Sequence, residues 1–244
     1  MELPVPPGYQ SLVPFDAERH RGMVPAQADF SFAAGQQTLF LTIAEFGAAG
    51  RDLVIAFAED SAGAAVPVAV TGLSSGSNLY IDADGRWPES VYCPAYLRRY
   101  PFYTLRLDAG QGDRFLVCVD EAGLAPAAAE QPLLDADGKP TGAWTLRERF
   151  LREVDAAQQR TVKLCARLQA LELLEPFEAD LTIKGEQPRR LTGLQRVSEA
   201  RLNALDGAEI KAMMAAGQLA ACYQHLTSLA NFNRLLDRQA AAAR

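Results

Sequence analysis

The stretch NLYIDADGRWPESVYCPAYLRRYPFY, residues 78–103, organises the rest of this 244-residue chain. It holds five of the seven tyrosines, one of the two tryptophans and an Arg-Arg pair set between aromatic residues. Asp82–Gly85 is a predicted turn, because Asp bonds nearby backbone N–H groups and Gly adopts positive φ. Pro94 and Pro101 bracket a short helix or an irregular loop. We call residues 78–103 the aromatic segment and expect it to tie strands together.

Short apolar runs on both sides of the aromatic segment predict strands. The turns between them are polar, and the last two runs form a hairpin pattern across residues 108–113. We therefore expect residues 16–120 to form a β-rich domain of short, mostly antiparallel strands. The predicted strands are Asp29–Ala33, Leu39–Ile43, Leu53–Ala58, Val66–Thr71, Leu79–Ile81, Phe102–Leu107 and Phe115–Val119.

Composition changes on both sides of this β-rich region. Residues 1–15 contain four prolines and predict an extended arm, since proline fixes φ and removes an N–H donor. Residues 121–140 are rich in Ala, Pro, Gly and acids and predict a connection. Residues 141–244 predict a mainly helical region, packed on the β-rich domain, with a small β-hairpin at about 180–197. The expected fold class is α+β.

Residues 141–174 carry the strongest helical pattern. Thr141 is a predicted N-cap, and the apolar side chains lie largely on one face. Arg147 and several other charged residues are interspersed, which is typical of a solvated side. This pattern predicts a long amphipathic helix that packs one face on the protein.

The charge balance narrows the classes of partner. The formal net charge is −6 and the pI is about 5.1, so non-specific nucleic-acid binding is not expected. The first residues lack the basic and apolar regions of a signal peptide. There is no apolar run of about 18 residues, the length that a membrane-spanning helix needs. We expect no membrane insertion and a cytoplasmic location.

Metal and cofactor motifs do not occur in the sequence. The four cysteines are far apart and show no CxxC spacing, which predicts reduced thiols rather than a zinc site. The two Asp-Ala-Asp-Gly stretches lack the spacing of a calcium loop and predict plain turns. P-loop, GxGxxG and GxSxG motifs do not occur. We expect no metal and no cofactor.

Two sets of residues are candidates for a binding site. Guanidinium groups between aromatic rings suit carboxylate or phosphate capture, or cation–π stacking. Alternatively, Arg98 and Arg99 are structural and bond backbone carbonyls and the acids of the turn at Asp82 and Asp84. His225 is either a core or interface histidine or a proton-transfer or ligand-binding residue. The candidate binding residues are Trp87, Tyr96, Arg98, Arg99, Tyr100 and His225.

The segment Pro94–Phe102, PAYLRRYPF, is preceded along the chain by Asn78–Tyr80 and Asp84–Trp87. Together these segments resemble the SapC-like family of bacterial surface-layer-associated proteins. Cys93 and Leu53-Val54 depart from the family's usual residues. The other matching segments are Glu18–Arg21, Ala44–Phe46, Cys118–Glu121, Leu133–Gly138 and Tyr223–Leu229.

The resemblance implies a bacterial protein linked to surface layers and envelope or uptake systems, and it carries over no catalytic residue. The first hypothesis is a non-catalytic accessory protein that recognises a peptide or protein partner through the Trp87–Tyr103 surface. The second is an enzyme that modifies envelope peptides, with a site around Arg98, Arg99 and His225. The third is a structural assembly subunit. The sequence leaves open the oligomeric state and whether the arm binds to the rest of its own protein.

Overall fold

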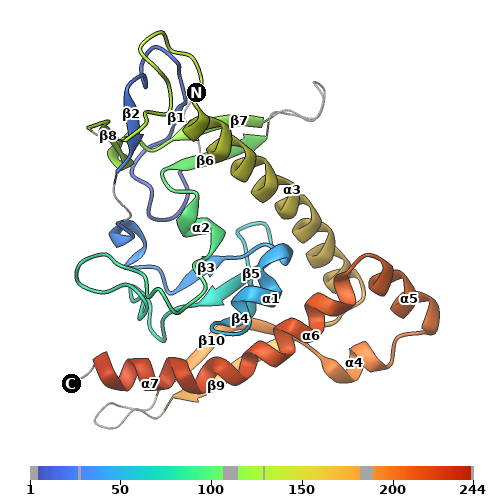
Figure 1. The fold of residues 1–244 in the computed structure, drawn as a ribbon. Helices are drawn as coiled ribbons and strands as arrows, with labels where there is room; N and C mark the ends of the chain where they lie inside the picture. The colour runs from blue at the N-terminus through green and yellow to red at the C-terminus, as the bar shows by residue number, and fades with distance from the viewer. Residues whose placement is uncertain (1–4, 27–28, 107–114, 129, 182–188, 243–244) are drawn as a thin grey trace.

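The main sheet has five antiparallel strands, and it draws on both halves of the chain. The computed structural model describes residues 5–26, 29–106, 115–128, 130–181 and 189–242. The strand order is β3-β5-β4-β10-β9, and every pairing in it is antiparallel (Figure 1). The strands are β3 (Thr38–Phe40), β5 (Ala65–Val70), β4 (Val54–Glu59), β10 (Arg189–Val197) and β9 (Leu174–Leu181).

Strand β4 lies at the centre of this sheet and of the larger core. Its first four residues, Val54–Phe57, are all buried, so both faces of the strand are covered. The run of β-branched and aromatic residues fits such a strand. The sheet is therefore packed on two sides.

A second, smaller sheet lies at the opposite end of the molecule, at the top of Figure 1. It contains β1 (Val13–Pro14), β7 (Phe115–Val119) and β6 (Phe102–Arg106), again antiparallel. The predicted hairpin of β6 and β7 is confirmed, while its turn at 108–113 lies outside the described residues. Beside it, β2 (Met23–Pro25) pairs with β8 (Leu124–Pro126).

Helix α3 (Gly142–Ala170) joins the two cores. It has 29 residues, hence a length of about 43 Å, and runs from the small sheet toward the main sheet (Figure 1). Trp144 and Leu151 are buried in the small core, and Leu164 and Leu168 are buried in the large one. Thr141 accepts a hydrogen bond from the Trp144 N–H, which confirms the predicted N-cap.

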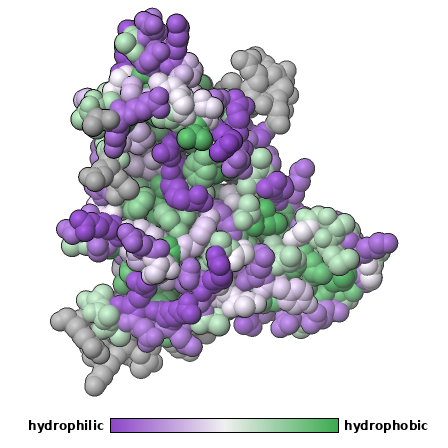
Figure 2. Space-filling view, in the orientation of Figure 1, coloured by the Kyte–Doolittle hydropathy of each residue, from purple (hydrophilic) through white to green (hydrophobic). Residues whose placement is uncertain are grey.

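Shorter helices cover the main sheet and extend one side of the molecule. Helices α6 and α7 follow one another along the bottom of Figure 1, and α4 and α5 project to the right. Apolar side chains gather over α5 in Figure 2, where Met214 is 63% exposed. The helices are α1 (Phe46–Ala49), α2 (Ala95–Arg98), α4 (Glu199–Asn203), α5 (Gly207–Ala215), α6 (Gln218–Ser228) and α7 (Phe232–Ala242).

The α+β fold class is confirmed, with sheets dominating the first half and helices the second. None of the helices in the described ranges is long and apolar enough to cross a membrane. Four 3-10 turns complete the described structure. They are Ser31–Ala33, Ile43–Glu45, Glu121–Gly123 and Leu229–Asn231.

Several local predictions differ from the structure. The strand predicted at Leu79–Ile81 is wrong, because Asn78 Oδ1 accepts the Tyr80 N–H and turns the backbone. The strand predicted at Asp29–Ala33 is wrong, because Asp29 Oδ1 accepts the Ser31 N–H and turns the backbone into the 3-10 turn Ser31–Ala33. The hairpin predicted at about 180–197 begins earlier, at Leu174, and is part of the main sheet rather than a separate unit.

The segments expected as an arm and a connection are both built into the fold. The arm's Tyr9 and Leu12 are buried in the large core, so in this structure the arm binds to the rest of its own protein. In the expected connection at 121–140, Leu133 and Leu134 are buried and β8 pairs with β2. The pairing of β10 with β4 joins the two regions that this connection was expected to separate.

Candidate functional site

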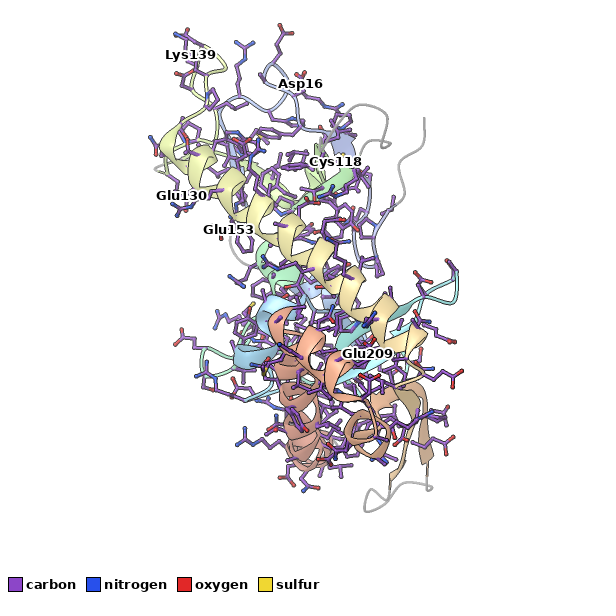
Figure 3. The ribbon with its side chains drawn as sticks, turned by 90° about the vertical axis from the view of Figure 1, so that its right-hand side faces the viewer. Asp16, Cys118, Glu130, Lys139, Glu153 and Glu209 are labelled. Atoms are coloured by element: carbon purple, nitrogen blue, oxygen red, sulfur yellow. The ribbon has the colours of Figure 1, made fainter. Side chains whose placement is uncertain are left out.

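A groove of about 860 Å³ lies where the arm, the aromatic segment and α3 meet. It is lined by Gly8 and Gln10 of the arm, by residues 29–32 and by Leu97, Arg98 and Tyr100 of the aromatic segment. Arg147 of α3 and Glu130 complete one side, and Figure 3 shows Glu130 beside the first turns of α3. We call this the arginine groove. Its volume is in the range of ordinary ligand sites.

Arg98 lines the arginine groove, and its exposed side chain is held in one orientation. Its Nε donates to the Cys93 carbonyl oxygen at 2.9 Å, and its Nη2 donates to the Tyr92 hydroxyl at 3.0 Å. Its guanidinium lies 5.6 Å from the Tyr92 ring centroid and 5.0 Å from that of Phe150. No described residue accepts a hydrogen bond from its Nη1. The guanidinium therefore has one fixed edge and one open end.

Arg147 is half-buried next to Arg98. Its Nη1 donates to the Arg98 carbonyl oxygen at 2.8 Å, and its guanidinium lies 5.7 Å from the Phe102 ring centroid. Burial lowers the pKa of Arg147 below its usual value, although a guanidinium stays charged under ordinary conditions. Neither arginine forms an ion pair with a carboxylate of the described residues.

A buried carboxylate supports Arg98 from behind. Glu45 is 5% exposed, and its Oε2 accepts the Thr42 N–H and hydroxyl at 2.8 and 2.9 Å. Its Oε1 accepts the Ala95 N–H at 2.6 Å and the Tyr92 hydroxyl at 3.2 Å. Burial, and then the Glu45 charge, raise the pKa of Tyr92 to about 12. Tyr92 therefore stays protonated, donating to Glu45 and accepting from Arg98.

Arg99 is a structural residue in this arrangement. It is 3% exposed, with its guanidinium 4.3 Å from the Tyr103 ring centroid and 4.8 Å from that of Tyr96. Its Nε has no hydrogen-bond partner among the described residues. Burial raises the pKa of the adjacent Tyr9 far above its usual value, against the opposing effect of Arg99. The charged guanidinium of Arg99 is thus buried against the rings of Tyr96 and Tyr103.

The acids of the predicted turn hold neither arginine, so that part of the structural alternative is wrong. Asp82 Oδ1 accepts the N–H groups of Asp84 and Arg86, as in a plain turn. Asp135 Oδ1 does the same for residues 137 and 139, which confirms the turn interpretation of both Asp-Ala-Asp-Gly stretches.

The other aromatic candidates are divided between two places. Tyr100 lines the arginine groove and stacks on Phe32, with ring centroids 4.0 Å apart. Tyr96 is buried, and its hydroxyl donates to the Pro7 carbonyl oxygen at 2.5 Å. Trp87 stacks on Tyr80, which faces a different pocket, of about 470 Å³, beside α7. The expected Trp87–Tyr103 surface is therefore not one continuous site.

His225 is a structural residue that bonds two strands of the main sheet. It is completely buried, its Nε2 accepts the Val197 N–H at 3.0 Å, and its Nδ1 donates to the Ile55 carbonyl oxygen at 2.9 Å. Burial lowers the pKa of His225 to about 4, so the ring is neutral. The imidazole thus bridges β4 and β10, and neither nitrogen is free to act on a ligand at Arg98.

Sequence reasoning missed Glu45, Tyr92 and Arg147. Glu45 lies in one of the short segments that resemble the SapC-like family, which is the only signal that pointed to it. Arg147 was assigned to a solvated helix face, because its contact with Arg98 is set by how α3 packs against α2. These residues are found only through contacts between distant parts of the sequence.

Thiols and metal-binding groups give no alternative site in the described structure. Burial raises the pKa of Cys93 and Cys118 to about 11 and that of Cys165 and Cys222 to about 12, so all four stay thiols. No group of three His, Cys, Asp or Glu side chains in the described residues is placed to hold a metal ion.

Fold and site define an α+β protein whose aromatic segment forms one wall of an arginine-lined groove. The sequence model of the SapC family matches residues 15–235, which is nearly the whole chain. This chain belongs to the SapC family, and the resemblance carried by PAYLRRYPF is confirmed. Comparisons with curated proteins and with solved structures gave no match.

Proposed function

We propose that this protein is a non-catalytic accessory protein that binds an extended segment of a partner protein in the arginine groove. The observation that supports the proposal is the pair Arg98 and Arg147, oriented by backbone and ring contacts but without carboxylate partners among the described residues. The stacked rings of Tyr100 and Phe32 supply an apolar surface in the same groove. Arginine and aromatic residues are the types that dominate binding energy at interfaces.

Binding is better supported than catalysis, because three candidate proton-transfer side chains already have their hydrogen-bonding atoms occupied. His225 has both ring nitrogens bound to the backbone, and the buried His20 contacts Asp16 and Glu121 through its two nitrogens. Glu45 accepts four hydrogen bonds and is buried. A general base must reach a substrate proton, and these groups are already engaged. The enzyme hypothesis assigned proton transfer to His225, and both nitrogens of that ring already bond the backbone.

The identity of the partner follows only from the family resemblance. SapC-like proteins are associated with bacterial surface layers, so the proposed partner is a protein of the surface layer or the cell envelope. The cytoplasmic location expected from the sequence stays a prediction and is part of this proposal.

Peptide display tests the proposal, with one variant that fills the groove. Ala26 lines the groove and is exposed, so Ala26→Trp adds bulk there without removing a core contact. Ala212→Trp, on the exposed face of α5, is the matched control. Peptides selected on the unmodified protein should bind the control equally and the groove variant at least tenfold more weakly. Peptides that bind all three proteins equally would contradict the proposal.

A further inference from the structure

We propose that the arginine groove selects a carboxylate of the partner segment, with Arg98 and Arg147 as its ligands. The carboxylate belongs to an acidic side chain or to the C-terminus of the partner, and an adjoining apolar or aromatic side chain packs on Tyr100 and Phe32. This inference rests on the proposed function and names the chemistry that the same groove recognises.

The first argument is the charge distribution. The sequence has 30 acidic and 24 basic residues, so carboxylates outnumber the cationic side chains. Many arginines pair with one, and Figure 3 shows Glu209 near the end of α3, where Arg167 pairs with it. Arg98 and Arg147 do not pair with a carboxylate of any described residue, and Arg147 donates instead to the backbone carbonyl oxygen of Arg98. The described arginines that do form pairs include Arg19, Arg106, Arg152, Arg196 and Arg201.

The second argument is the geometry of the Arg98 guanidinium. Its Nε and Nη2 atoms lie on one edge, and that edge donates to Cys93 and Tyr92. The end formed by Nη1 and the second Nη2 hydrogen has no acceptor among the described residues. A planar pair of N–H groups matches the two oxygens of a carboxylate. The open end is thus shaped for a bidentate contact.

The third argument is that the site is already ordered. The Arg98 guanidinium lies over the rings of Tyr92 and Phe150, 5.6 and 5.0 Å from their centroids. Glu45 accepts the Tyr92 hydroxyl hydrogen, which turns the oxygen lone pairs of Tyr92 toward Arg98. A ligand that meets a fixed guanidinium does not have to order a flexible side chain. Glu45 and Tyr92 are therefore positioning residues for Arg98.

Charge in the rest of the groove favours a singly charged ligand group. Asp29 and Glu130 also line it, and hydrogen bonds from Ser31 lower the pKa of Asp29, so its carboxylate stays ionised. Two arginines and two acids give these side chains no net charge, so a phosphate dianion would add two uncompensated negative charges. A carboxylate carries one charge and fits this balance better.

The test uses 3-phenylpropanoate as the probe and its uncharged amide, 3-phenylpropanamide, as the control ligand. Nitrogen-detected NMR of the arginine Nε–H groups reports contact with Arg98 and Arg147. We expect the carboxylate to shift both signals and to bind at least about tenfold more tightly than the amide. Equal binding of the two probes, or tighter binding of inorganic phosphate than of the carboxylate, would overturn the inference.

Variants separate the two arginines from general charge effects. Arg98→Gln with Arg147→Gln should weaken probe binding at least about tenfold, since both charged donors are lost. Arg160→Gln, on the exposed side of α3, should leave binding unchanged. If the double variant unfolds, Tyr92→Phe keeps the ring and removes the hydroxyl that orients Arg98. A several-fold loss is expected there, and unchanged binding in Tyr92→Phe would contradict the positioning role.

Selected peptides distinguish this inference from the proposed function. Peptides blocked by Ala26→Trp should lose binding when their Asp and Glu residues become Asn and Gln, or when their C-terminus is amidated, and the two changes identify the source of the carboxylate. If blocked peptides bind equally well after both changes, the carboxylate inference fails while the proposed function stands. If no peptide is blocked by Ala26→Trp, the proposed function itself fails.

Discussion

Replacing Glu45 by Gln keeps the shape of the side chain and removes its charge. The carboxylate accepts N–H groups at both oxygens, from Thr42 at Oε2 and from Ala95 at Oε1. A Gln amide has one oxygen, so whichever way it turns, its NH₂ faces a backbone N–H that has lost its acceptor. One buried N–H is therefore left unpaired in either orientation.

The magnitude follows from these contacts. Losing a hydrogen bond to a charged group costs about 1.5–3 kcal/mol, and leaving a buried donor unsatisfied costs about 1–3 kcal/mol. We expect the free energy of unfolding to fall by about 3 kcal/mol. In a protein of this size 1 kcal/mol corresponds to about 2–4 °C, so the thermal midpoint should fall by about 6–12 °C.

Urea unfolding followed by circular dichroism measures this change, with Glu153→Gln as the control. Glu153 is 67% exposed on α3 and contacts Arg149 at 3.9 Å, so its loss should cost less than about 0.5 kcal/mol. The Tyr92 phenol should also titrate below its present pKa of about 12, because the neighbouring negative charge is gone. A loss of stability under about 1 kcal/mol in Glu45→Gln would refute the reasoning.

Three further substitutions test other parts of the fold. The pKa of His225 is about 4 in the folded protein and about 6.5 when unfolded, so the neutral ring contributes stability above pH 6.5 that is lost as the pH falls toward 4. His225→Gln should remove about 3 kcal/mol of that pH dependence, measured as the difference between the two stability–pH curves. Gly123→Ala places a methyl 2.5 Å from Pro101 and 2.6 Å from the Tyr100 ring, and should lower the free energy of unfolding by about 1–3 kcal/mol. Gly207→Ala is the control, because its methyl meets no atom within 4 Å and the free energy of unfolding should change little. Thr141→Ala should cost about 1 kcal/mol through loss of the α3 cap, and an unchanged thermal midpoint would show that the cap is not needed.

Local patterns in the sequence were sufficient to predict much of the secondary structure. The β6–β7 hairpin, the α3 cap and both Asp-Ala-Asp-Gly turns depend on residues close together in the sequence, and all were predicted. The failure at Asp29–Ala33 has a local cause as well. Alternating polar and aromatic residues suggested a strand, but the Asp29 carboxylate accepts the Ser31 N–H and a 3-10 turn forms instead.

The candidate site was only partly predictable, because its geometry depends on distant contacts. Sequence pointed to Arg98 and Arg99 together, yet one faces the arginine groove and the other is buried among tyrosines. Glu45 lies about 50 residues before Ala95, whose N–H it accepts, and no periodic pattern records that pairing. His225 looked like a possible proton carrier because burial and backbone partners cannot be read from a single histidine on a helix.

The pairing of β10 with β4 has a consequence for how the protein folds. Gln195 lies opposite Phe57, a separation of 195 − 57 = 138 residues, so this sheet has a high contact order. During synthesis on the ribosome β4 can pair with β5 early, but its other edge has no partner until residues 189–197 emerge. An open edge of buried-type apolar residues is a site for aggregation. The nascent polypeptide therefore depends on late-arriving sequence, and slowed or truncated translation should expose it to misassembly.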